Sequence, residues 1–159
     1  MWRRLCSTRA SILVFPRHPD GAPAVLKGVV VHGDKRGRSL GFPTANICIS
    51  ETIAPPEHGV YCCRVRLETD SRAYGATCSI GTNPTFDDVF DTRVEAYIHD
   101  FDRSIYGQRI ELEILAFLRD MRRFSNVDEL VAQTITDVER SRAMLARHRE
   151  TNPSMDFPF

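Results

Sequence analysis

The hydrophobic period of this chain changes once, near residue 125, and the change limits the folds that it can adopt. Between residues 109 and 118 apolar side chains occupy every second position, which is the period of a half-buried β-strand; they are Ile110, Leu112, Ile114, Ala116 and Leu118. From Val127 onward the spacing is helical, with apolar residues at Leu130, Val131, Ile135, Val138 and Leu145. Ser125 and Asp128 have the spacing of a capping box, which predicts that a helix begins here.

Five more strand-like segments precede this point, at residues 25–31, 47–49, 59–67, 73–80 and 94–99. A polar glycine-rich loop, HGDKRGRS, a turn with two prolines at 54–57 and a long loop, GTNPTFDDVFD, separate them. Strands and helices do not alternate, which argues against a Rossmann sheet. We predict a mainly β fold, an antiparallel barrel or sandwich of about six strands with one packing helix.

Composition restricts the partners. The chain has 159 residues, enough for one domain, and its 21 basic residues balance its 21 acidic ones. Zero net charge gives no reason to expect nucleic acid or a membrane surface as a partner. We expect small-molecule ligands. Independently of the charge, we expect a monomer. We divide the chain into a leader at 1–23, one domain at 24–150 and a tail at 151–159.

The first residues are basic, with four arginines before residue 18 and no acidic residue before Asp20. This pattern is typical of a mitochondrial presequence, but equally of a basic leader or a misplaced start codon. We expect a cytoplasmic protein, with mitochondria as the alternative. Five cysteines without a CxxC pair, Cys6, Cys48, Cys62, Cys63 and Cys78, predict buried, reduced thiols. Cys62 and Cys63 are expected to point to opposite faces of a strand.

The loop from Gly33 to Gly41 combines three glycines with Lys35, Arg36 and Arg38. Backbone amides and cations of this kind suit a phosphate-binding nest, although the spacing is not that of a Walker A loop. A solvated basic turn is the alternative interpretation.

The sequence GFPTAN follows, with Thr44 and Asn46 two residues apart. An extended segment places both on the same side. A hydroxyl and an amide oxygen are ligands that Mg²⁺ accepts when nucleotide phosphates supply the negative charge. The alternative is a structural turn in which Asn46 caps a backbone amide.

Glu95 lies in a strand, between Val94 and Tyr97. A carboxylate flanked by apolar residues pairs with a cation or has a chemical role, and a hydroxyl nucleophile needs such a proton acceptor. The alternative is an exposed glutamate paired with Arg93 or Arg109. We expect Glu95 to face the Thr44/Asn46 pair across the mouth of the barrel.

Taken in order, KGVVVHGDKRGRSLGFPTAN, HGVYCCRV, SIGTNPTF, VEAYIHDFDRSIYG and LRDMRRF resemble the riboflavin kinase family over residues 26–147. The resemblance implies a six-stranded antiparallel Greek-key β-barrel with a C-terminal α-helix, the riboflavin-kinase-like split barrel. It also implies ATP-dependent phosphorylation of the ribityl 5′-hydroxyl of riboflavin, giving FMN and ADP. Because only residues 1–23 precede the barrel, we expect a monofunctional kinase without FAD synthesis.

The resemblance also implies roles for individual residues. Thr44 and Asn46 would hold Mg²⁺, or Zn²⁺ or Mn²⁺, and the nucleotide phosphates, and Glu95 would take the ribityl proton. Contacts with ATP are implied for Gly33, Arg38, Ile98, Asp100 and Tyr106. A second flap that closes on the flavin is implied for Arg119, Arg122 and Phe124. The chain departs from the family at Met121, often glutamate, at Tyr97, often histidine, and at Arg38, often lysine.

Two other functions fit parts of the pattern. A barrel that binds flavin or nucleotide without catalysis would need neither the base nor the metal pair. An oligonucleotide-binding barrel would carry a basic, aromatic strand face, which this neutral chain lacks.

Overall fold

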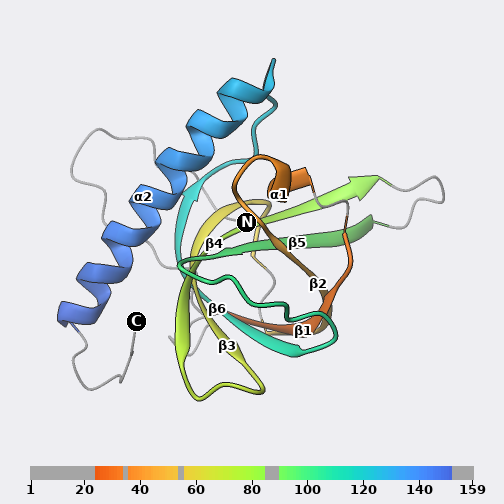
Figure 1. Cartoon of the computed structure of the whole chain (residues 1–159), viewed down its shortest axis with the longest axis vertical. Helices are drawn as coiled ribbons and strands as arrows, with labels where there is room; N and C mark the ends of the chain where they lie inside the picture. The colour runs from red at the N-terminus through yellow and green to blue at the C-terminus, as the bar shows by residue number, and fades with distance from the viewer. Residues whose placement is uncertain (1–23, 34–35, 54–55, 85–89, 152–159) are drawn as a thin grey trace, which may run out of the picture.

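The computed structural model describes residues 24–33, 36–53, 56–84 and 90–151 (Figure 1). The predicted leader, Cys6 and the predicted tail beyond Thr151 lie outside these residues. The elements, in chain order, are β1 (Val25–Val31), α1 (Arg36–Ser39), β2 (Ala45–Ile53), β3 (Gly59–Leu67), β4 (Ala73–Pro84), β5 (Phe90–Ile98), β6 (Arg109–Arg119) and α2 (Val127–Thr151). No helix of the described chain is both long and apolar enough to span a bilayer.

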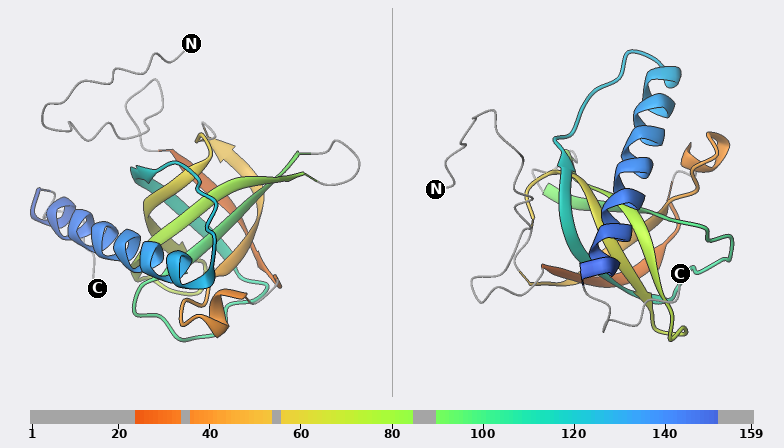
Figure 2. Two further views of the ribbon diagram at one scale, coloured as in Figure 1. Left: turned by 90° about the horizontal axis from the view of Figure 1, so that it is seen from above. Right: turned by 90° about the vertical axis from the view of Figure 1, so that its left-hand side faces the viewer.

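The six strands form a closed barrel in the order β1-β2-β5-β4-β3-β6, and all neighbours are antiparallel. Figure 2, from above, shows the strands surrounding a common interior, with α2 lying across the outside. Closure gives each of the six strands two neighbours. The predicted barrel with a C-terminal helix is therefore confirmed.

The barrel interior and the surface beneath α2 form two separate apolar cores. Ile110, Leu112 and Ile114 of β6 point into the barrel as predicted, but Ala116 and Leu118 pack beneath the helix instead. The pairing of β3 with β6 shifts between Cys62 and Cys63, which leaves an extra residue on β6. A bulge of this kind exchanges the two faces of a strand, so the simple alternation failed here.

Several loops predicted from polar composition are partly regular. The first four residues of GTNPTFDDVFD extend β4, and the last two begin β5, because the two strands pair in register from Ala76–Ile98 to Pro84–Phe90. β2 is likewise longer than the predicted 47–49, and a short helix, α1, occupies part of the glycine-rich loop. Sheet pairing satisfies backbone groups whatever the side chains, so it overrides weak local preferences.

The buried face of α2 consists of Asp137, Val138, Ser141 and Leu145. Val138 and Leu145 agree with the predicted stripe, whereas Ile135 is 45% exposed. Ile135 lies roughly 100° around the helix from the centre of the buried face, because each residue turns the helix by about 100°.

The helix N-terminus is capped by Asn126 rather than by Ser125. The Asn126 Oδ1 accepts a hydrogen bond from the backbone N–H of Glu129, at 2.9 Å. The Glu129 carboxylate in turn accepts one from the backbone N–H of Ser125, at 3.1 Å. The cap is therefore one residue further along than predicted, and it is not a full capping box, because Glu129 accepts from the residue before the cap and not from the cap residue itself.

Cys62 and Cys63 point to opposite faces of β3, as predicted, with Cys63 inside the barrel and Cys62 beneath α2. Cys78 is also a buried thiol, but Cys48 is exposed, so the prediction was wrong for that residue. Burial raises the pKa of the Cys62 thiol to about 12. Cys62, Cys63 and Cys78 thus agree with the prediction of buried free thiols.

Candidate functional site

Two glycines make room for the side chains of the GFPTAN segment. A Cβ on Gly33 would overlap the Asn46 side chain, whose Oδ1 would be 2.6 Å away. A Cβ on Gly37 would overlap the backbone oxygen of Phe42 and approach the Thr44 Oγ1 to 3.3 Å. The glycine-rich loop thus lies directly against the threonine and the asparagine, which explains why a larger residue does not fit at either position.

Asn46, Glu95 and Ser79 form a row across three neighbouring strands. Asn46 pairs with Glu95 between β2 and β5, and Ser79 pairs with Glu95 between β4 and β5. Directly opposite residues share a face, and the adjacent Ala96, Val94 and Ile80 are buried in the barrel core. Glu95 therefore lies beside Asn46 on the outer face of the barrel, not across its mouth as expected.

Glu95 also forms an ion pair with Arg93, as the alternative interpretation of this residue expected. Its Oε1 is 3.7 Å from Nη1 of Arg93, and the Glu95 side chain is 33% exposed. The contact is within one strand, two residues apart, and both groups line the same cavity. An exposed pair of this kind is weak, so the contact does not exclude a chemical role for the carboxylate.

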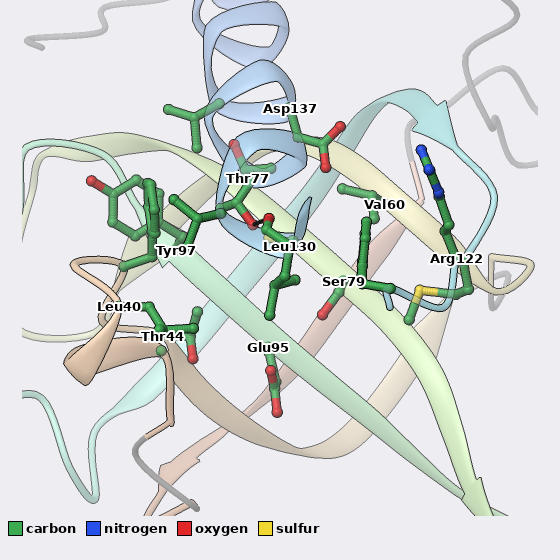
Figure 3. Close-up of a pocket in the computed structure, with 18 of the residues that line it drawn as sticks. Leu40, Thr44, Val60, Thr77, Ser79, Glu95, Tyr97, Arg122, Leu130 and Asp137 are labelled. Atoms are coloured by element: carbon green, nitrogen blue, oxygen red, sulfur yellow. Dashed lines mark hydrogen bonds between the residues drawn. The ribbon is translucent and has the colours of Figure 1, made fainter. Parts of the chain in front are cut away.

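This cavity, which we call the outer pocket, has a volume of about 370 Å³ and lies between the barrel and α2. Figure 3 shows Thr44 and Glu95 toward one side of it, with Asp137 and Arg122 on the other. Its walls are Leu40 and Phe42 after α1, Thr77, Ser79, Glu95 and Tyr97 on the sheet, and Leu130, Thr134, Asp137 and Val138 on α2. Residues 119–124, which we call the arm, complete it with Arg119, Met121, Arg122 and Phe124. The volume is within the range of sites for small organic ligands.

A second cavity, the end pocket, has a volume of about 380 Å³ and lies at one end of the barrel. Gly33, Arg38, Ile98 and Tyr106, all predicted to contact the nucleotide, line it. Asp102 and Arg103 also line it, although the sequence analysis did not select them. At its rim the rings of His32 and Tyr106 stack, with centroids 3.8 Å apart.

Thr44 and Asn46 line both cavities. The outer pocket and the end pocket therefore meet at the two neutral oxygen-bearing side chains, with Glu95 on the outer side. Among the described residues, these two are the ones that line both cavities.

Asp100 is the one predicted site residue that lines neither cavity. It adopts a left-handed backbone conformation, with φ of 52°. Its carboxylate accepts two hydrogen bonds from Arg142 of α2, at 2.8 and 2.9 Å, and these lower the pKa of Asp100. Its predicted contact with a nucleotide stays a prediction.

The arm is tied to α2 by a polar network that the sequence analysis missed. Asp137 accepts hydrogen bonds from Nε of Arg119, at 2.9 and 3.1 Å, and from Nε2 of Gln133, at 3.0 Å. The Gln133 Oε1 accepts one from Arg122, at 3.4 Å. The helical pattern predicts burial for apolar residues only, so it gave no prediction for Asp137. The signal that could have identified it is its position next to Val138, on the buried face of the helix.

The donor set at the junction suits a hard cation held together with phosphates. In the described part of the chain, no group of three or more His, Cys, Asp or Glu residues could hold a metal ion. The oxygens of Thr44 and Asn46 are neutral, and the space left by Gly33 accommodates the Asn46 side chain. Such a pair fits Mg²⁺ that takes its remaining ligands from a nucleotide and water.

Comparisons with known proteins agree with this geometry. A protein-family profile named Flavokinase, described as riboflavin kinase, matches residues 20–145. A bifunctional riboflavin kinase/FMN adenylyltransferase of Listeria monocytogenes is 42% identical over 127 residues, which are 80% of this chain and 40% of that protein.

Solved structures show the same likeness. The structure of riboflavin kinase from Trypanosoma brucei matches with a TM-score of 0.54 and 26% identity, over 82% of this chain and 84% of that one. One described as a macrolide-efflux protein from Streptococcus pneumoniae matches with a TM-score of 0.70 and 41% identity, over 77% and 39% of the two chains. The chain spans about 40% of the length of the bifunctional relative from Listeria monocytogenes. It belongs to the flavokinase family, the family of riboflavin kinases.

Proposed function

We propose that this chain is a riboflavin kinase, which transfers the γ-phosphoryl group of ATP to the ribityl 5′-hydroxyl of riboflavin and releases FMN and ADP. The observation that carries the proposal is the meeting of two cavities at Thr44 and Asn46, next to Glu95. Two substrates need two cavities, and a transfer between them needs a shared junction with a proton acceptor on the acceptor side.

In this proposal the nucleotide occupies the end pocket. Arg38 supplies positive charge toward the phosphates, and Ile98 and Tyr106 supply the apolar and aromatic wall. Thr44 and Asn46 orient the terminal phosphate toward the outer pocket and would hold the divalent cation. That cation, when bound, neutralises charge on the phosphates; Mg²⁺ is the proposed ion, and Zn²⁺ or Mn²⁺ are alternatives.

Riboflavin occupies the outer pocket, with its ribityl chain directed to the junction. The 5′-hydroxyl oxygen attacks the γ-phosphorus, the bond from that phosphorus to the bridging oxygen breaks, and ADP leaves with the bond electrons. Glu95 takes the hydroxyl proton. The carboxylate is placed for this by its pairing with Asn46 on the next strand.

The apolar and aromatic walls of the outer pocket are suited to a flat ring system. Phe124 on the arm and Leu130 and Val131 on α2 face the cavity. An aromatic side chain can stack on a ring ligand, and aliphatic side chains exclude water from it. Arg122 and Phe124 line this cavity, which supports the proposal that they contact the flavin.

The test is FMN formation from riboflavin, ATP and Mg²⁺, followed by chromatography with and without a chelator. Glu95→Gln is expected to lower kcat by roughly 10²–10⁴-fold while ADP binding is retained. Glu111→Gln is the matched control, because Glu111 is a strand glutamate paired with Lys27 at 3.6 Å and lines neither the outer nor the end pocket.

Three outcomes would count against the proposal. Wild-type protein that binds both substrates without forming FMN would indicate a binding barrel instead. Full activity of Glu95→Gln would show that Glu95 is not the base. Undiminished turnover in the presence of the chelator would show that the reaction needs no divalent ion.

A further inference from the structure

We propose that Asp137 is a positioning residue: together with Gln133, one turn earlier on α2, it holds the arm against the outer pocket through Arg119. The inference rests on the proposed function, because it takes the outer pocket as the site of riboflavin. It deepens that function by assigning the geometry of the flavin wall to a buried carboxylate on the helix.

The first step is the burial of the carboxylate. The side chain of Asp137 is 3% exposed although it faces a ligand-sized cavity. A buried carboxylate is costly unless charged or polar donors surround it. Its donors here are Arg119 on the arm and Gln133 on the helix, so the carboxylate is the point at which the arm is attached to α2.

The second step concerns what Arg119 has left to offer a ligand. Its Nε and Nη2 both face Asp137, with Nη2 2.8 Å from Oδ2. Its Nη1 donates to the backbone oxygen of Asp120 at 2.9 Å. Each nitrogen therefore makes an internal contact, and of the five N–H donors of a guanidinium at most two remain for a ligand. We therefore infer that Arg119 acts on riboflavin mainly by holding the arm in place.

The third step is the position of Phe124. The guanidinium of Arg119 lies 5.8 Å and that of Arg122 5.5 Å from the centre of the Phe124 ring. Arg122 also donates to Gln133, and Gln133 donates to Asp137. Arg119 and Arg122 of the arm are thus both bound to α2, and both lie against the Phe124 ring. Together they fix this ring at the wall of the outer pocket.

A residue with this role has a distinct kinetic signature. Loosening the arm lowers the population of the arrangement that receives riboflavin, and the end pocket is untouched because none of these residues lines it. The KM for riboflavin rises, whereas the KM for ATP does not. A defect of the whole fold would instead lower the active fraction and leave both constants unchanged.

The experiment measures KM and kcat for both substrates in folded Asp137→Asn, Arg119→Gln and the double variant. Asp137→Asn keeps the volume and removes the charge; we expect the riboflavin KM to rise about tenfold and the ATP KM to change less than about twofold. Adding Arg119→Gln should raise the riboflavin KM by less than a further factor of about two, because both changes break one contact.

Arg142→Gln is the control. It cuts another ion pair between α2 and the barrel, the one with Asp100, and Arg142 lines neither cavity. We expect its riboflavin KM to stay at the wild-type value. Should Asp137→Asn fail to fold, Gln133→Ala removes the neutral member of the network and is expected to raise the riboflavin KM by roughly two- to fivefold.

The inference is overturned if folded variants keep the wild-type riboflavin KM, if both KM values rise together, or if the two substitutions add in full. Wild-type protein that forms no FMN would instead reject the proposed function. In that case riboflavin binding, measured by its fluorescence, still compares the variants.

Discussion

Replacing Gly33 with alanine should damage catalysis while leaving the fold almost intact. The added Cβ would overlap the amide group of Asn46, with Oδ1 at 2.6 Å, so that side chain must move. The group that moves is the free end of a side chain, and turning it away from its preferred rotamer costs on the order of 1 kcal/mol. Gly33 itself needs no left-handed backbone, because only Gly41 and Gly107 have positive φ among the described glycines.

The catalytic cost is expected to be much larger. Displacing a group that positions the reacting atoms by about 1 Å lowers rates by roughly 10²-fold, which corresponds to about 2.7 kcal/mol of transition-state stabilisation. We therefore expect kcat for FMN formation to fall by about two orders of magnitude, while the free energy of unfolding in urea falls by about 1 kcal/mol or less.

Two comparisons test the cause. Gly28→Ala places its Cβ against the backbone oxygen of Cys48, which cannot move away, so it should destabilise the fold by about 1–3 kcal/mol yet leave kcat per folded molecule unchanged. In an Asn46→Ala background, Gly33→Ala should change kcat by less than about twofold. If Gly33→Ala lowered kcat equally in both backgrounds, its effect would not pass through Asn46 and the reasoning would be refuted.

Two further predictions concern protonation. Burial, with a smaller contribution from Arg142, lowers the pKa of His99 from 6.5 to about 4. Between these values the unfolded chain binds the proton and the folded chain does not. Stability should therefore fall by up to about 3 kcal/mol as the pH drops from 6.5 to 4. His99→Gln should flatten this part of the pH profile in urea titrations, and an unchanged slope would contradict the assignment. Since Cys48 is exposed and burial raises the pKa of Cys62, Cys48→Ser should remove one thiol that reacts rapidly with a disulfide reagent at pH 8; Cys62→Ser should remove none. Equal loss of rapid thiols in both variants would show that Cys62 is accessible.

The sequence by itself determined the classes of element, and it led to the kinase chemistry that we propose. The change of period near residue 125 predicted strands followed by a helix, and the local spacing of Thr44 and Asn46 placed their oxygens on one side of an extended segment. These features depend on neighbours in the chain, because strand and helix periods are properties of local backbone geometry. The strand pattern selected Glu95 as a candidate base, and the family resemblance supplied the kinase hypothesis.

The tertiary structure decided where these residues meet. Strand order placed Glu95 next to Asn46 on the outer face, and the same outer face combined with α2 and the arm to form the outer pocket. The bulge opposite Cys62 and Cys63, which moved Ala116 and Leu118 beneath the helix, has no local signal in the alternating sequence.

Asp137 shows the same limit. Asp137 can be buried because Arg119, at the end of β6, donates hydrogen bonds to it. No preference of aspartate within a helix predicts this. Pairing between distant segments is set by packing and by the need to satisfy buried polar groups. Local sequence patterns contain no information on that pairing. The elements could therefore be predicted, whereas the junction of the two pockets and the attachment of the arm to α2 could not.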